Sequence, residues 1–131
     1  MEATQKNFRK RNAILSYLQH TDAHPSAETI FADLKSEIPD LSIGTVYRNL
    51  ALFKDKGMII SVGTVKGVER FDGNTEPHVH HLCTGCGRVT DLPNIRVPEE
   101  LNQAAAAQAH GTVSACQLSF TGTCAECATK N

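Results

Sequence analysis

The chain has 131 residues, 40% of them hydrophobic and 21% charged, a composition typical of a soluble globular protein. The formal net charge of −1 excludes a uniformly basic protein, so any nucleic-acid binding must use local basic patches. No signal-peptide pattern is visible, and the longest apolar runs are too short to span a bilayer. We therefore expect a cytoplasmic protein with no membrane partner, in which five cysteines favour metal or redox chemistry over disulfides.

The first predicted helix spans residues 7–20, where Ile14, Leu15 and Leu18 share one face. Glu2 is the only acidic residue before position 20, and four cations crowd this stretch: Lys6, Arg9, Lys10 and Arg11. These cations predict a phosphate-binding patch, with an ordinary solvated helix surface as the alternative.

Two more helices are predicted before residue 57. Pro25 suits the first turn of the second helix, which should end before Pro39. Ser42 is the expected N-cap of the third helix, and Gly57 is placed to cap its C-terminus.

Strand-like runs at 58–62 and 68–71, joined by a loop at 63–67, predict a β-hairpin. Three helices followed by a hairpin form the winged-helix arrangement, a variant of the helix-turn-helix. Gly, Asn and Pro lie close together in residues 73–78, which predicts a linker or hinge.

The second half has a different pattern. Runs at 79–82 and 88–91 predict a hairpin around a Cys-x-x-Cys turn, followed by a helix at 98–109 with Leu101 on its buried side. Residues 112–121 alternate like a strand. The expected fold class is α+β, with a winged-helix domain at 1–72, a hinge at 73–78 and a small α/β domain at 79–131.

Four cysteines form two Cys-x-x-Cys pairs: Cys83, Cys86, Cys124 and Cys127. Two such pairs can complete a closed, tetrahedral structural zinc site. The alternative is two independent redox dithiols. The fifth cysteine, Cys116, is expected to be half-buried in a strand, with an accessory ligand or a reactive thiol as the alternative.

Histidines and carboxylates supply further ligand candidates. His78 and His80 share one face of a strand, a spacing that suits chelation of one metal, whereas His81 points to the other face. For His81, the favoured interpretation is an ordinary strand or interface histidine. Spacing alone does not bring three further candidates together with them: His24, Asp72 and Asp91.

The chain resembles the ferric uptake regulator family from about Arg9 to Cys127. The resemblance is carried jointly by the stretches 24–30, 42–50, 70–72, 78–87 and 124–127. It implies a homodimeric repressor of transcription that binds palindromic double-stranded DNA through the winged helix and dimerises through the C-terminal domain.

By resemblance, the regulatory metal positions are His24, Asp72, His78, His80 and Asp91. Nitrogen and oxygen ligands suit Fe(II) or Mn(II), whereas the cysteine site selects zinc. Metal binding would fix the angle between the winged helix and the dimer core, so that two wings meet successive half-sites.

Asp91 stands where iron-responsive members usually carry Glu, and so resembles the peroxide-sensing branch. There, bound Fe(II) reacts with hydrogen peroxide, a ligand histidine (here His24 or His78) is oxidised and the DNA is released, while Mn(II) is an unreactive corepressor. This is sensing and not turnover, so we do not expect an enzyme. Arg48 in the third helix matches iron regulators better than peroxide sensors, so an iron-responsive or other metal-responsive regulator is kept as an alternative. A small metal hydrolase is the alternative from another class.

The third helix is the expected DNA reader. Val46, Leu50 and Phe53 define its core face, so Tyr47 and Arg48 should face DNA, where Arg can read guanine edges. The full set of expected DNA contacts is Lys6, Arg9, Lys10, Arg11, Ser42, Thr45, Tyr47, Arg48 and Lys66.

Overall fold

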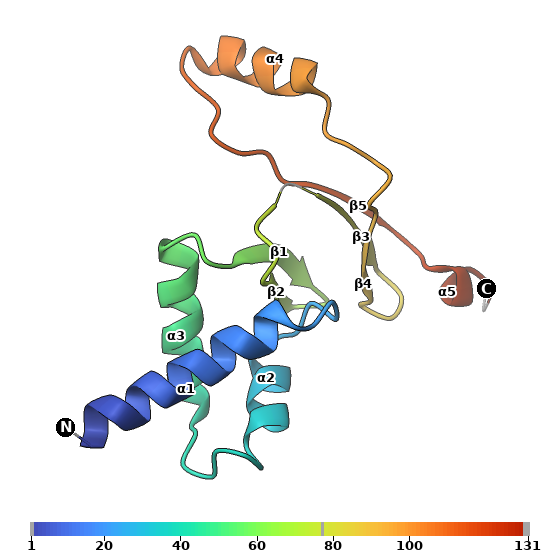
Figure 1. Cartoon of the computed structure of the whole chain (residues 1–131). Coiled ribbons are helices and arrows are strands. Elements are labelled where there is room, and N and C mark those ends of the chain that lie inside the picture. Colours follow the sequence, from blue (N-terminus) through green and yellow to red (C-terminus); the bar gives the residue numbers. More distant parts are fainter. Residues whose placement is uncertain (1, 77, 130–131) are drawn as a thin grey trace. The chain divides into compact units, whose positions relative to one another are not determined.

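The computed structural model describes residues 2–76 and 78–129, with side chains from residue 7 onward (Figure 1). The chain forms two compact units, Met1–Thr75 and Glu76–Asn131, called here the N-terminal and C-terminal units. Within the described residues, no helix is both long and apolar enough to cross a membrane.

The N-terminal unit has the predicted winged-helix order of three helices and a hairpin (Figure 1). Its elements are α1 (Glu2–Gln19), α2 (Ala27–Leu34), α3 (Ile43–Asp55), β1 (Ile60–Val65) and β2 (Val68–Asp72). Its core is mainly aliphatic, and the apolar stripes of all three helices meet in it, with Ile14, Ile30 and Phe53 at most 1% exposed.

Helix caps explain where two of these helices begin. Ser42 is the N-cap of α3, as predicted, and its Oγ accepts a hydrogen bond from the Thr45 N–H at 3.1 Å. In α2 the predicted start is wrong. Ser26 is the N-cap, with its Oγ 3.2 Å from the Thr29 N–H, so Pro25 lies before the helix and not in its first turn. The first helix begins at Glu2, earlier than the apolar pattern indicated.

The wing differs from the predicted five-residue loop. Strands β1 and β2 pair up to Val65 and Val68, which leaves a two-residue turn of Lys66 (φ 54°) and Gly67 (φ 80°). Positive φ at both central residues is typical of a type I′ turn, whose twist matches that of the strands. The β1 strand also begins later than predicted, at Ile60, and a register shift near Ser61 interrupts its pairing.

Gly73 leaves β2 against the backbone at the end of α1. A Cβ at this position would lie 2.5 Å from the carbonyl oxygen of Leu18, closer than real Cβ atoms approach. Only glycine therefore lets the chain pass this point without a shift of α1 or of the chain itself.

The C-terminal unit is built on a three-stranded sheet with the order β4-β3-β5 (Figure 1). Its elements are β3 (Val79–Cys83), β4 (Val89–Asp91), α4 (Glu99–Ala109), β5 (Leu118–Gly122) and α5 (Ala125–Thr129). The β3–β4 hairpin is antiparallel, as predicted, whereas β5 joins β3 in parallel.

Two predictions for this unit are wrong. The last strand begins at Leu118, so most of the segment expected to be strand lies outside the sheet. Leu101 is 45% exposed, and α4 contributes no buried residue in the single chain. The apolar pattern of α4 marks a face that its own chain does not cover.

Candidate metal centres and DNA-binding surface

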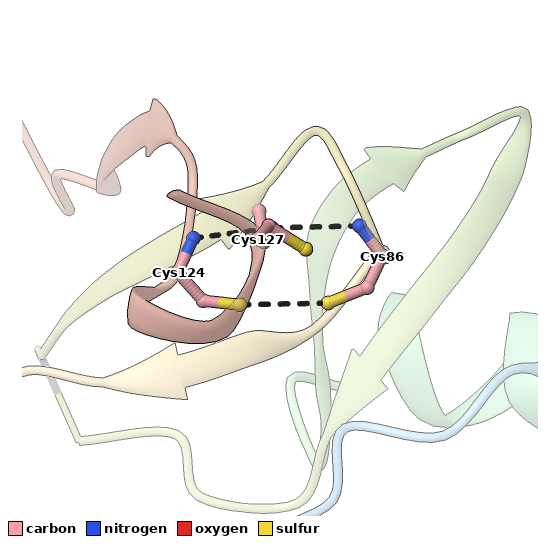
Figure 2. A group of neighbouring side chains, drawn as sticks. Cys86, Cys124 and Cys127 are labelled. Atoms are coloured by element: carbon pink, nitrogen blue, oxygen red, sulfur yellow. Dashed lines mark hydrogen bonds between the residues drawn. The ribbon is translucent and has the colours of Figure 1, made fainter. Parts of the chain in front are cut away.

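The four paired cysteines lie together in the C-terminal unit. Cys83 ends β3, Cys86 lies in the following turn, Cys124 precedes α5 and Cys127 lies within it. Figure 2 shows three of these side chains turned towards one another. The four sulfur atoms all lie within 4.8 Å of one another, and those of Cys86 and Cys124 are 3.8 Å apart.

Backbone amides prepare this cluster for a cation. The buried Cys83 sulfur accepts N–H groups from Cys86 (3.4 Å) and Cys124 (3.2 Å), which lowers the pKa of Cys83 to about 5. Hydrogen bonds with Cys124 and Cys83 raise the pKa of Cys127 to about 12. The thiolate form of Cys83 is thus stabilised, while the thiol of Cys127 keeps its proton. A bound divalent cation would displace the remaining thiol protons, and four thiolates fit tetrahedral zinc.

Gly85 makes the close packing of the cluster possible. A Cβ on this residue would lie 2.9 Å from the Cys127 sulfur and 3.0 Å from the Cys127 Cβ. Cys116 is half-buried, as expected, but it precedes β5 and is outside the four-sulfur cluster.

In the N-terminal unit, His24 and Asp72 form a buried pair. The two residues are 2% and 5% exposed, and His24 Nε2 lies 3.2 Å from Asp72 Oδ2. The second Asp72 oxygen, Oδ1, accepts the Asn74 N–H at 2.8 Å. The backbone of His24 has a φ of 54°, in the left-handed region.

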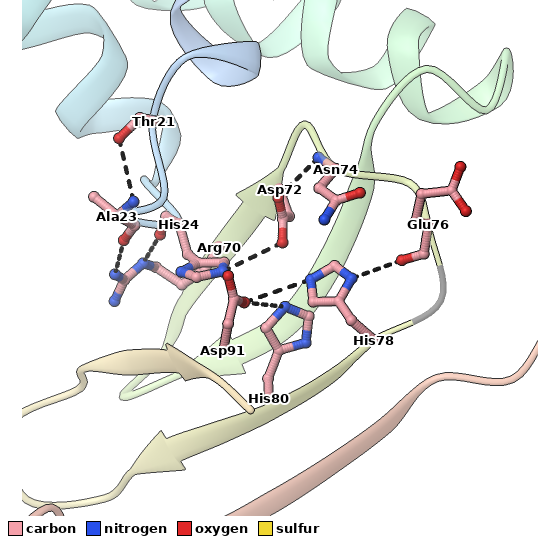
Figure 3. Close-up of polar contacts among 10 residues, drawn as sticks. All are labelled: Thr21, Ala23, His24, Arg70, Asp72, Asn74, Glu76, His78, His80 and Asp91. Carbon is pink, nitrogen blue, oxygen red and sulfur yellow. Dashed lines mark hydrogen bonds and ion pairs between the residues drawn. The ribbon is translucent and has the colours of Figure 1, made fainter. Parts of the chain in front are cut away.

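In the C-terminal unit, Asp91 contacts two histidines. Its Oδ1 is 3.4 Å from His78 Nε2 and 3.2 Å from His80 Nε2 (Figure 3). His80 lies directly opposite Asp91 in the β3–β4 register, and His78 immediately precedes β3. His81 pairs with Thr90 instead, as the alternation along a strand requires.

The hydrogen bond on the other side of the His78 ring tests whether this group suits a metal. His78 Nδ1 lies 2.6 Å from the Glu76 carbonyl oxygen, which can only accept, so Nδ1 carries the proton. In a neutral ring, Nε2 then presents a lone pair to the Asp91 carboxylate, and two acceptors face each other. A cation beside them removes this repulsion, and a backbone carbonyl on the far nitrogen is the usual support of a ligating histidine.

The outward face of α3 carries the expected DNA-reading side chains. Val46, Leu50 and Phe53 are buried, as the helical pattern predicted, while Arg48 is exposed and Tyr47 is 49% exposed. Ser42 is exposed and Thr45 half-buried at the start of the helix.

Neighbouring side chains orient Tyr47 and Arg48. The Tyr47 hydroxyl donates to Glu28 of α2, and Arg48 donates to the Thr45 hydroxyl at 3.0 Å. Sequence reasoning missed Glu28, because its partner lies on another helix.

The expected phosphate contacts differ in their surroundings. Arg9 and Lys66 are exposed, Lys66 at the tip of the wing. Lys10 is bound to Asp40 at 3.2 Å with its side chain 14% exposed, and Arg11 donates to Asn49 of α3 at 3.2 Å. The side chain of Lys6 lies outside the described residues. A groove of about 330 Å³ between α1 and α3 is lined by Asn7, Arg11, Thr45, Arg48, Asn49 and Leu52.

Known proteins resemble this chain over most of its length. The model of the ferric uptake regulator family matches residues 2–121. The peroxide operon regulator of Bacillus subtilis strain 168 is 36% identical over 123 residues, covering 92% of this chain and 83% of that protein. The peroxide-responsive repressor of Staphylococcus aureus strain USA300 is 33% identical over 121 residues, covering 92% and 81%.

Among solved structures, the Campylobacter jejuni peroxide stress regulator superposes with a TM-score of 0.81 at 23% identity, covering 96% of this chain and 94% of that one. At this identity the likeness concerns the fold.

Proposed function

The chain belongs to the ferric uptake regulator family, and from this membership we propose that it is a metal-dependent DNA-binding repressor that senses hydrogen peroxide through Fe(II). The observation that carries the proposal is Asp91, a short carboxylate in contact with both His78 and His80. The similar proteins are named as regulators, which disfavours the metal-hydrolase alternative.

The four cysteines would hold a structural zinc. Cys83, Cys86, Cys124 and Cys127 offer a soft, all-sulfur donor set with no place for substrate. The ion would tie α5, at the end of the unit, to the turn that follows β3. A small unit gains much from such a link because it buries little apolar surface.

The regulatory ion would be shared by the two units. We assign to it the His24–Asp72 pair of the N-terminal unit and the group of His78, His80 and Asp91 in the C-terminal unit. All five donors are nitrogen or oxygen, which suits Fe(II) or Mn(II) better than the cysteine site does.

Sharing one ion provides a mechanism for repression. An ion bound by both units favours one orientation of the winged helix, because other orientations separate its ligands. Losing one histidine ligand would release that orientation. When bound, Fe(II) would activate peroxide so that one of its oxygens is added to a ligand histidine and the other leaves as water, whereas Mn(II) would leave the ligands intact. His24 and His78 are the residues we expect to be oxidised.

The active form would be a homodimer on a palindromic operator. In the single chain, three large apolar side chains of the C-terminal unit are each 45% exposed, and a second copy would cover them: Ile95, Leu101 and Phe120. Each winged helix would place α3 in the major groove, with Tyr47 and Arg48 towards the bases and the wing-tip Lys66 near a phosphate.

Mass spectrometry of the Fe(II)-loaded dimer after brief peroxide treatment tests this function. We expect a single-oxygen adduct on His24 or His78 and loss of binding to operator DNA, with neither change in Mn(II)-loaded protein. An unmodified protein whose DNA binding simply follows free Fe(II) would identify an iron-responsive regulator instead. Equal DNA binding by zinc-loaded protein with and without the regulatory ion would remove the proposed mechanism altogether.

A further inference from the structure

His24 has a backbone conformation that needs support. Its φ of 54° is in the left-handed region, which is sterically unfavourable for a residue with a side chain. The residue is also buried, with its ring against Asp72. Such a conformation persists only where surrounding contacts hold it.

Strand β2 supplies these contacts through Arg70 and Phe71. The Arg70 guanidinium donates from Nε to the His24 carbonyl and from Nη2 to the Ala23 carbonyl at 3.0 Å (Figure 3). The Phe71 N–H donates to the next carbonyl, that of Pro25, at 3.0 Å. Three successive carbonyls of the loop before α2 are therefore bound by two successive residues of one strand.

The same strand carries the partner of the His24 ring. Asp72 lies two residues after Arg70, so both side chains point to the same face of β2. Arg70 holds the backbone of His24 while Asp72 meets its Nε2 at 3.2 Å. Two side chains of one strand thus contact the same histidine, the guanidinium at its backbone and the carboxylate at its ring.

We propose that Arg70 is a positioning residue for the regulatory metal: by binding the carbonyls of Ala23 and His24, it holds the His24 imidazole where it can share an ion with Asp72. The inference rests on the proposed function, since it assumes that His24 is a ligand. Arg70 itself contributes no ligand atom, because a guanidinium is a cation with donors only.

Mn(II) binding to the full-length, zinc-loaded protein tests the proposal, with free Mn(II) measured by electron paramagnetic resonance. Arg70→Met should weaken Mn(II) binding about 10- to 100-fold, the usual effect of losing a residue that supports a ligand. Arg70→Lys keeps the charge but can bind only one carbonyl, so it should give a smaller loss. Lys56→Met removes an exposed cation from the same unit and should bind Mn(II) like the wild type.

A second readout follows His24 directly in the zinc-loaded protein without Mn(II). In Arg70→Met, the ring nitrogen resonances of His24 should move while those of His80 stay in place, and the Phe71 amide should exchange faster with solvent. A general loss of folding would instead shift all histidines and lower the helical circular dichroism. If Arg70→Met does not fold, Arg70→Lys decides by the same measurements.

The outcomes separate the two proposals. Wild-type Mn(II) affinity and an unmoved His24 in the folded Arg70 variants would overturn the positioning role. Unchanged Mn(II) affinity in His24→Ala would instead overturn the assignment of His24 as a ligand, and with it the proposed regulatory site.

Discussion

In the proposed function, the choice of signal depends on Asp91. Its Oδ1 contacts the Nε2 atoms of His78 and His80, and its position on β4 is set by pairing with His80. A glutamate here would carry its carboxylate one methylene further from the strand. The two imidazoles would stay in place, while the oxygen between them would move.

We predict that Asp91→Glu retains metal-dependent DNA binding but loses much of its histidine oxidation. The longer side chain still offers an oxygen ligand, but it changes the surroundings of the ion that face peroxide. Oxygen adducts on His24 and His78 after a fixed peroxide exposure measure the effect, with Asp91→Asn as a variant that keeps the length. Oxidation equal to that of the wild type would refute our assignment of this position.

Lys66 has an unfavourable backbone conformation at the tip of the wing. It occupies the first position of a type I′ turn with a φ of 54°, where Asn is preferred. A lysine at this position is less stable than Asn but provides an exposed positive charge.

Replacing Lys66 by Asn should therefore stabilise the N-terminal unit by up to about 1 kcal/mol while weakening DNA binding. The slope of log K against log salt should become shallower by about 1 for each phosphate that the lysine no longer neutralises. Urea unfolding and operator binding at several salt concentrations measure the two effects, and Lys66→Arg should retain the slope. A stabilised variant with unchanged DNA affinity would exclude Lys66 from the interface.

At the scale of elements, Tyr17 joins α1 to α2. Its hydroxyl donates to Asp33, and burial together with this hydrogen bond and charge raises the pKa of Tyr17 from 10.0 to about 12. A raised pKa means that folding favours the protonated phenol. The contribution to stability is thus fully present below pH 10 and is lost as the pH rises through about 12.

Absorbance titration can observe this directly, because the chain has two tyrosines and no tryptophan. In Tyr47→Phe, the remaining phenol should ionise near pH 12 for as long as the protein stays folded. Adding Asp33→Asn should bring the midpoint down towards 10. A midpoint near 10 in the folded Tyr47→Phe protein would show that the α1–α2 contact is absent.

The turn of the cysteine cluster depends on Gly85. A methyl group here would meet Cys127 at 2.9–3.0 Å, so Gly85→Ala should push α5 away and weaken zinc binding by at least about 10-fold. Competition with a chromogenic chelator measures the affinity. Gly111→Ala is the matched control, because its nearest neighbour would be 3.9 Å away. Equal zinc retention in both variants would contradict the packing described for the cluster.

The local sequence patterns predicted the helices, the strands and the cysteine pairs better than they predicted the contacts between distant residues. The buried face of α3 follows from the spacing of Val46, Leu50 and Phe53, and the paired cysteines from their own spacing. The Lys66 turn was missed because lysine has no preference for positive φ. The role of Arg70 was missed because backbone carbonyls, its partners, leave no mark in a sequence.

Leu101 shows a different limit. A helical pattern reveals that a face is apolar, but whether that face is buried depends on what covers it, and the single chain does not cover it.

At the scale of the whole molecule, the two units hold together by different means. Twelve buried residues form the core of the N-terminal unit, whereas the buried apolar residues described in the C-terminal unit are Val79, Cys83 and Val89. A unit with so small a core needs a metal or a partner chain to stay folded.

Removal of zinc by a strong chelator should consequently unfold the C-terminal unit and leave the N-terminal unit folded. Hydrogen exchange followed by mass spectrometry should show loss of protection in β3 and β5, with α1 and α3 still protected. Zinc-loaded protein in the same buffer without the chelator is the control. Simultaneous loss of protection in all four elements would show that the N-terminal unit cannot stand alone.

The close approach of Gly73 to the end of α1 has a mechanical consequence. The chain that leaves β2 presses directly on the last turn of an 18-residue helix, which is about 27 Å long. A pull on the linker therefore acts at one end of a rigid helix, and Arg9 lies about 14 Å from this end, nine residues before Leu18. A tilt of about 10° around this end would move the backbone at Arg9 by about 2 Å, which is enough to break a hydrogen bond of about 3 Å.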